Sequence, residues 1–119
     1  MHIRFDGQTA IVTGAAHGFG RAIALTFAKL GAHVVACDVL ADELEVTARL
    51  AKEQGISVDV RVVDVSHRQE VAAMVGETLA ARSRIDVLVN DAGGVIGQVG
   101  RPLEEVSEAD WRAIFILSR

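Results

Sequence analysis

Three glycines are spaced as Gly14-x-x-x-Gly18-x-Gly20 after an apolar run, and a helical pattern begins directly after them. The first glycine permits a tight turn off a strand, and the second lets the backbone approach phosphates. The third lets the following helix pack closely on the strand. Unpaired N–H groups at the start of that helix favour an anion. The pattern predicts a pyrophosphate site, although by itself it also fits a sharp turn with close packing.

An acid, Asp38, follows the second apolar run, about 20 residues beyond the glycine turn. A carboxylate at this place binds the ribose 2′ and 3′ hydroxyls of an adenosine and repels a 2′-phosphate. No Arg or Lys adjoins it, since Val39 comes next, and His17 rather than a strong cation precedes Gly18. The sequence therefore predicts NAD in preference to NADP. The alternative role for Asp38 is a helix cap.

Two further polar groups follow apolar runs. Asp64 is placed to accept a hydrogen bond from an adenine amino group while the N–H of Val65 meets a ring nitrogen; alternatively, Asp64 is a plain strand end. Asn90 is placed to bridge neighbouring strand ends, and Ala92 and Gly93 leave room for a ribose at a crevice beyond the strands. The alternative for Asn90 is an ordinary Asx turn.

Alternating strand and helix patterns position these residues. The runs 9–13, 33–37, 58–63 and 85–89 are strand-like, and helical patterns occupy 19–30, 44–55, 71–79 and 107–115. Such alternation predicts an α/β fold with a parallel sheet and helices on both faces. Phe19, Ile23, Phe27 and Leu30 share one face of the first helix, and Ser66 with Gln69 forms a capping-box pattern before the third.

The composition excludes several classes of function. The 119 residues fit one domain, and the net charge of -4 offers no general attraction to nucleic acid or to an anionic membrane. No apolar run reaches the roughly 18 residues of a membrane span, and the first residues lack a signal-peptide core. The single cysteine, Cys37, is expected to be a buried strand residue and suits the cytoplasm. No metal site is predicted.

Taken together, these motifs resemble the classical short-chain dehydrogenase/reductase family, in its NAD-preferring branch. The resemblance implies a Rossmann-type, doubly wound parallel sheet, truncated here to four strands in the order 3-2-1-4, over residues 1–119. It implies hydride transfer between an alcohol and a carbonyl. It assigns the pyrophosphate to residues 14–20, with His17 and Phe19 contributing through their backbone. It assigns the ribose to Asp38 and the adenine to Asp64 and Val65. The middle of the cofactor is assigned to Asn90, Ala92 and Gly93.

The chain departs from that family in several places. Asp91 stands where the family usually has a second asparagine, and Ser118 stands where an asparagine follows Trp111 by seven residues. Longer family members continue with a catalytic serine and a Tyr-x-x-x-Lys pair, but this chain contains no tyrosine. We therefore assign no catalytic residue and expect the chain alone to be inactive, whereas a full-length parent would take a small alcohol or carbonyl substrate.

The truncation has a further consequence. The strand at 85–89 is expected to form a bare apolar edge, which favours self-association. Two other classes of function remain open: a non-catalytic dinucleotide-binding or assembly module, and a methyltransferase-like domain, which also pairs a glycine turn with an acid. The Thr13-Gly14 spacing and the Asn90 motif argue against the methyltransferase.

Overall fold

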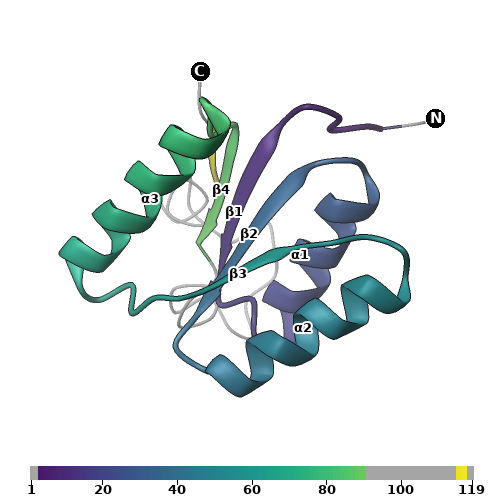
Figure 1. The fold of residues 1–119 in the computed structure, drawn as a ribbon, viewed down its shortest axis with the longest axis horizontal. Helices are drawn as coiled ribbons and strands as arrows, with labels where there is room; N and C mark the ends of the chain where they lie inside the picture. Colours follow the sequence, from purple (N-terminus) through teal and green to yellow (C-terminus); the bar gives the residue numbers. More distant parts are fainter. Residues whose placement is uncertain (1–2, 91–114, 118–119) are drawn as a thin grey trace, which may run out of the picture.

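The computed structural model describes residues 3–90 and the strand 115–117 (Figure 1). Its elements are β1 (Thr9–Thr13), α1 (Gly18–Lys29), β2 (His33–Asp38), α2 (Ala41–Glu53), β3 (Asp59–Val62), α3 (Arg68–Arg82), β4 (Val87–Asn90) and β5 (Phe115–Leu117). The first four strands pair in parallel in the order β3-β2-β1-β4. This confirms the predicted order, 3-2-1-4. No helix of the described residues is both long and apolar enough to cross a membrane.

Helices cover both faces of the sheet, with α1 and α2 on one side and α3 on the other (Figure 1). Successive side chains of β1 point to opposite faces, so both faces need apolar residues. Val12 packs in the cluster that contains α1 and α2, whereas Ile11 packs with Met74 of α3. All three side chains are buried, which explains why β1 is an uninterrupted apolar run.

The buried face of α1 is made of small residues. Gly20, Ala24 and Ala28, four residues apart, are buried. The large apolar residues share one side of the helix, as predicted, but they are not the fully buried ones, and Phe19 is 57% exposed. Small side chains let the helix backbone approach the sheet closely.

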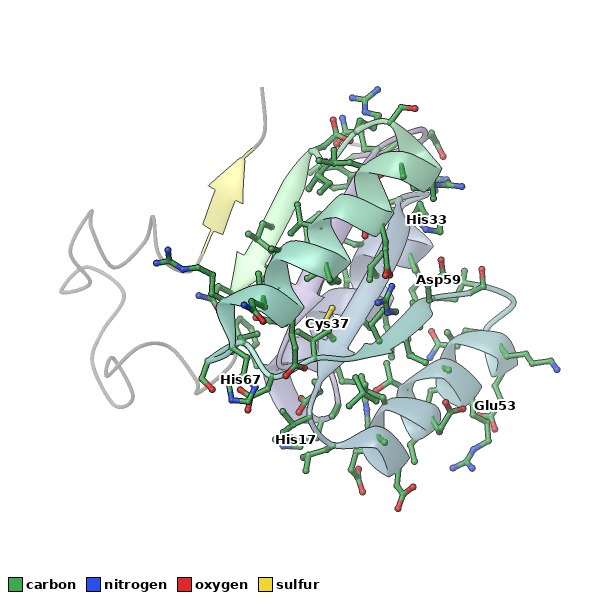
Figure 2. The ribbon with its side chains drawn as sticks, turned by 60° about the vertical axis from the view of Figure 1, so that its left-hand side comes forward. His17, His33, Cys37, Glu53, Asp59 and His67 are labelled. Atoms are coloured by element: carbon green, nitrogen blue, oxygen red, sulfur yellow. The ribbon has the colours of Figure 1, made fainter. Side chains whose placement is uncertain are left out.

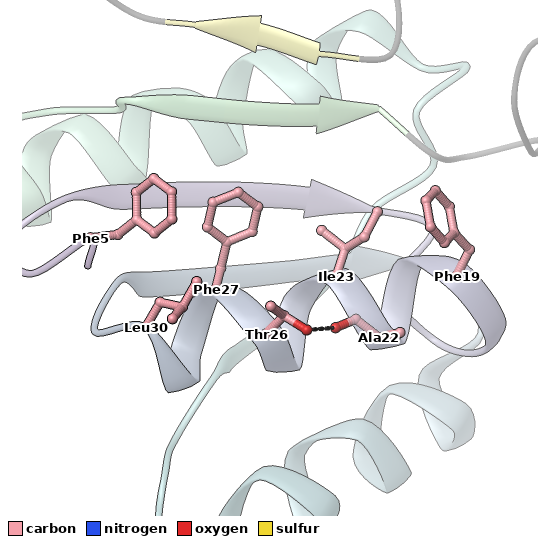
Figure 3. A pocket seen from close by; sticks show the side chains of 7 residues that line it. All are labelled: Phe5, Phe19, Ala22, Ile23, Thr26, Phe27 and Leu30. Atoms are coloured by element: carbon pink, nitrogen blue, oxygen red, sulfur yellow. Dashed lines mark hydrogen bonds between the residues drawn. The ribbon is translucent and has the colours of Figure 1, made fainter. Parts of the chain in front are cut away.

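The larger residues of α1 lie along its side. Phe5, Ile23 and Phe27 are partly buried against the core, and the rings of Phe5 and Phe27 contact one another with centroids 5.0 Å apart. With Phe19 they line an apolar hollow of about 290 Å³ (Figure 3).

The predicted capping box before α3 is wrong. His67 is the N-cap residue and its side chain makes no capping bond. The Asp64 carboxylate instead accepts from the N–H of Ser66 at 2.9 Å and from its hydroxyl at 2.6 Å. An Asx turn thus engages the serine that the pattern assigned to the cap.

The edge at β4 is also different from the expectation. β5 pairs antiparallel with β4, with Val87 opposite Leu117 and Val89 opposite Phe115. The expected bare edge is therefore covered on that side, and Phe115 belongs to a strand rather than to a helix. An apolar run beside unpaired N–H and C=O groups satisfies them by adding a strand. The rest of the predicted helix, 107–114, lies outside the described residues.

Candidate functional site

The glycine turn leaves β1 at the carboxyl end of the sheet. β1 pairs with β2 on one side and with β4 on the other, so the chain order reverses at this point. Figure 2 shows His17 and His67 at this end of the sheet and His33 at the opposite end. In open α/β sheets, ligands bind beyond the carboxyl ends of the strands where the order reverses.

Two glycines of the turn adopt a left-handed backbone conformation. Gly14 has φ of 65° and Gly18 has φ of 56°, which side-chain-bearing residues rarely adopt. His17, between them, is extended and exposed, and no side chain caps the helix. The turn is thus shaped by backbone rather than by side chains.

The start of α1 carries unused hydrogen-bond donors. The first bond of the helix runs from the N–H of Arg21 to the carbonyl of His17 at 3.3 Å. The N–H groups of Gly18, Phe19 and Gly20 have no acceptor among the described residues. Because these donors stand at the positive end of the helix dipole, their arrangement is suited to an anion.

Asp38, at the end of β2, bonds the same turn. Its Oδ2 accepts from the N–H of Ala16 at 3.1 Å, and its Oδ1 accepts from those of Val39 at 2.7 Å and Leu40 at 3.2 Å. Leu40, not Asp38, is the N-cap residue of α2. A carboxylate has about four acceptor positions, so one on Oδ2 is left for a ligand hydroxyl.

Two residues that sequence reasoning missed hold the other side of the turn. Thr47 of α2 donates its hydroxyl to the carbonyl of Ala15 at 2.8 Å. Arg21 bonds the carbonyl of Ala16 and the hydroxyl of Thr47. Thr47 could have been found in the sequence as a polar residue within the apolar stripe of α2, between Leu44 and Ala51.

The predicted adenine-binding pair lies after β3. The N–H of Val65 has no acceptor among the described residues, whereas Oδ1 of Asp64 is already engaged by Ser66. The hydrogen bonds from Ser66 lower the pKa of Asp64. His67 Nδ1 lies 2.7 Å from Oε2 of Glu70, and this bond, followed by the charge of Asp64, raises the pKa of His67.

Asn90 ties two strand ends together, as predicted. The hydroxyl of Thr13, at the end of β1, donates to Oδ1 of Asn90 at 3.0 Å and to the carbonyl of Val89 at 3.3 Å. This contact joins β1 to β4 at the carboxyl edge. Ala92 and Gly93, the other two predicted residues of this group, lie outside the described residues.

Cys37 is a buried residue of β2, as predicted, and packs on the α3 side of the sheet. Burial raises the pKa of its thiol to about 12. Because the thiolate is the reactive form, this cysteine is a packing residue and not a nucleophile.

Comparison with known proteins agrees with this geometry. The family model for short chain dehydrogenases matches residues 8–118. The 3-oxoacyl-acyl-carrier-protein reductase of Thermotoga maritima is 35% identical over 112 residues, which cover 94% of this chain and 44% of that protein. The 7alpha-hydroxysteroid dehydrogenase of Escherichia coli is 37% identical over 93 residues, which cover 78% of this chain and 36% of that protein.

A solved structure shows the same arrangement. A metagenomic short-chain oxidoreductase in complex with NADP superposes with a TM-score of 0.70 at 36% identity, over 92% of this chain and 49% of that chain. The chain spans less than half the length of the curated relatives that it matches. It belongs to the short chain dehydrogenase family, whose members are oxidoreductases that bind a nicotinamide dinucleotide.

Proposed function

We propose that residues 1–119 form the cofactor-binding domain of an NAD-dependent short-chain dehydrogenase. One observation carries the proposal: the turn whose Ala16 N–H bonds the carboxylate of Asp38 leads directly into the unpaired N–H groups of Gly18, Phe19 and Gly20. The Asp38 carboxylate is hydrogen-bonded to Ala16 of the same turn. Donors suited to a pyrophosphate and an acceptor suited to ribose hydroxyls thus lie at neighbouring strand ends.

The remaining cofactor contacts follow the same edge of the sheet. In this proposal Gly14 shapes the turn, and His17 and Phe19 contribute through their backbone. Asp64 and Val65 receive the adenine. Asn90, Ala92 and Gly93 line the middle of the cofactor. When bound, NAD supplies the hydride acceptor, and the residues of this chain bind and orient it.

The preference for NAD over NADP rests on the charges near the ribose. Asp38 would repel a 2′-phosphate, and neither Val39 nor His17 offers the strong cation that a phosphate needs. The nearby guanidinium of Arg21 is already bonded to the turn and lies 3.3 Å from Oε2 of Glu43. One solved neighbour holds NADP, so family membership alone does not decide between the two cofactors.

The catalytic step needs groups beyond these residues. The chain has no tyrosine to exchange a proton with a substrate, so we propose that it binds cofactor without turning over an alcohol or carbonyl by itself. The second candidate is a non-catalytic binding or assembly module. The two candidates are separated by a fusion protein in which the C-terminal half of a matched relative is joined after Arg119. Recovery of alcohol oxidation supports the dehydrogenase. Cofactor binding without recovery of activity supports the module.

Calorimetric titration of the chain with NAD, NADP and S-adenosylmethionine tests the cofactor. We expect NAD to bind most tightly and S-adenosylmethionine to release no heat of binding. Equal affinities for NAD and NADP would contradict the preference. Binding of S-adenosylmethionine alone would contradict the dinucleotide site.

Two further parts of the proposal concern the state of the protein in the cell. We place it in the cytoplasm, on the evidence of its single buried cysteine. Self-association was predicted from a bare edge at β4, but β5 covers that edge. It therefore stays a prediction without that support. Sedimentation velocity at micromolar concentration checks it, and a single monomeric species contradicts it.

A further inference from the structure

The backbone carbonyls of the glycine turn are held by side chains from two helices. The hydroxyl of Thr47, with 0% exposure, donates to the carbonyl of Ala15 at 2.8 Å and lies 3.4 Å from that of Ala16. Thr47 therefore points a fully buried polar group from α2 into the turn. A buried hydroxyl on a helix can bond the carbonyl one turn earlier, but that of Glu43 lies 3.4 Å away, so the shorter bond of Thr47 is the one to the turn.

Arg21 completes this arrangement from the first turn of α1. Its Nε donates to the hydroxyl of Thr47 at 2.9 Å. Its Nη2 donates to the carbonyl of Ala16 and, at 3.0 Å, to that of Glu43 in α2. The side chain of Arg21 is only 20% exposed. Its rigid fork of donors thus joins the turn to α2 through several bonds at once.

The peptide groups of Ala15 and Ala16 are consequently fully engaged. Their N–H groups bond the carbonyl of Cys37 at 3.0 Å and the carboxylate of Asp38 at 3.1 Å. Their carbonyls bond Thr47 and Arg21. Carbonyl oxygens carry partial negative charge, so fixing them on Thr47 and Arg21 prevents them from turning toward an anion. The donors left for a ligand are those at the start of α1.

We propose that Thr47 and Arg21 are positioning residues that hold the turn in the shape that binds a pyrophosphate. The inference rests on the proposed dinucleotide site, because it explains how that site keeps its form. It differs from a direct role for Arg21 as a phosphate ligand. It also differs from a role for Thr47 in core packing alone.

Thr47→Val keeps the volume of the side chain and removes the hydroxyl, and Thr47→Ser restores the hydroxyl. Thr78→Val is the matched control, since the buried Thr78 of α3 donates to the carbonyl of Met74 at 2.8 Å, away from the turn. The first readout is hydrogen exchange of the Ala15 and Ala16 amides in the ligand-free full chain. The second is the affinity for ADP-ribose, which contains the pyrophosphate, beside that for adenosine, which lacks it.

We expect Thr47→Val to speed exchange at both amides and to weaken ADP-ribose binding, each by about tenfold, while adenosine affinity changes less than about twofold. Thr47→Ser should restore both values, and Thr78→Val should leave both at the wild-type level. Unchanged exchange at the two amides overturns the proposal. So does faster exchange with unchanged ADP-ribose affinity. A wild-type chain that binds no ADP-ribose contradicts the proposed function instead, and the exchange rates then decide whether Thr47 holds the turn.

Arg21→Lys keeps the charge and removes the fork, whereas Arg21→Gln removes the charge as well. If Arg21 is a positioning residue, both variants weaken ADP-ribose binding and speed exchange at Ala16. If Arg21→Lys binds ADP-ribose like the wild type and only Arg21→Gln fails, Arg21 acts through its charge on the phosphates. That result overturns its positioning role.

Discussion

The carboxylate of Asp38 accepts a hydrogen bond from the backbone N–H of Ala16 at 3.1 Å. This bond joins the end of β2 to the glycine turn that follows β1. The residue proposed to select the cofactor therefore also shapes the turn proposed to hold its phosphates. In the proposed site, recognition of the ribose and binding of the pyrophosphate would thus be coupled through one side chain.

Asp38→Asn should change both properties. In Asp38→Asn an NH₂ group replaces one carboxylate oxygen, so a donor then faces a backbone N–H. The free energy of unfolding should therefore fall by about 1 kcal/mol. Loss of the negative charge should raise the affinity for NADP relative to NAD. Urea unfolding and calorimetric titration measure the two effects. The control is Asp42→Asn, which changes an exposed acid in the first turn of α2. If the ratio of the NAD and NADP affinities is unchanged in Asp38→Asn, Asp38 does not select the cofactor.

His67 should make stability depend on pH. Its pKa is raised above the ordinary 6.5, chiefly by its bond to Glu70. The stability that protonated His67 contributes to the fold is therefore complete below pH 6.5. It is lost as the pH rises through the raised pKa. The pKa of Glu70 is lowered by the same bond, so its contribution is present above its ordinary 4.5 and is lost as the pH falls through the lowered value.

His67→Gln should remove the alkaline loss. The denaturant midpoint of the wild type should fall from mildly acidic to alkaline pH, and that of the variant should fall less. The groups are exposed, so added salt should reduce the difference. Identical pH profiles for the two proteins would show that the pair does not stabilise the fold.

Leu44 anchors α2 on the sheet, with 1% of its surface exposed. Leu44→Ala should lower the free energy of unfolding by about 3 kcal/mol, because it removes buried methyl groups and leaves a cavity. Leu79→Ala makes the same chemical change at a residue that is 45% exposed and should cost less than about 1 kcal/mol. Equal losses in urea unfolding would contradict the assignment of Leu44 to the core.

Much of the sheet could be predicted because β1 and β2 are buried on both faces. Such strands must be apolar throughout, as in Ile11 and Val35, and the acid or amide that ends the run then marks the carboxyl edge. The same logic located Asp38 and Asn90. The buried face of α1 could not be predicted by counting large apolar residues, because close packing selects small ones such as Ala24.

The contacts of the turn were beyond sequence reasoning for another reason. Thr47 and Arg21 are 26 residues apart and meet only because α1 and α2 pack side by side. β5 was missed because a three-residue strand has too few residues to show a period. Local patterns identify an element when its own burial is regular. They do not identify bonds between elements.

Calorimetric titration with NAD of the wild type, Gly18→Ala and Gly55→Ala tests the dinucleotide site most directly. Both glycines have positive φ, 56° and 75°, and open space around an added Cβ, so each alanine should cost about 1 kcal/mol of stability. Only Gly18 lies in the turn, where in the proposed site an added methyl group would meet the phosphates. The wild type and Gly55→Ala should bind NAD with the same affinity, and Gly18→Ala should bind at least about tenfold more weakly. Equal affinities for the two variants, or a wild type that binds no NAD, would contradict the site.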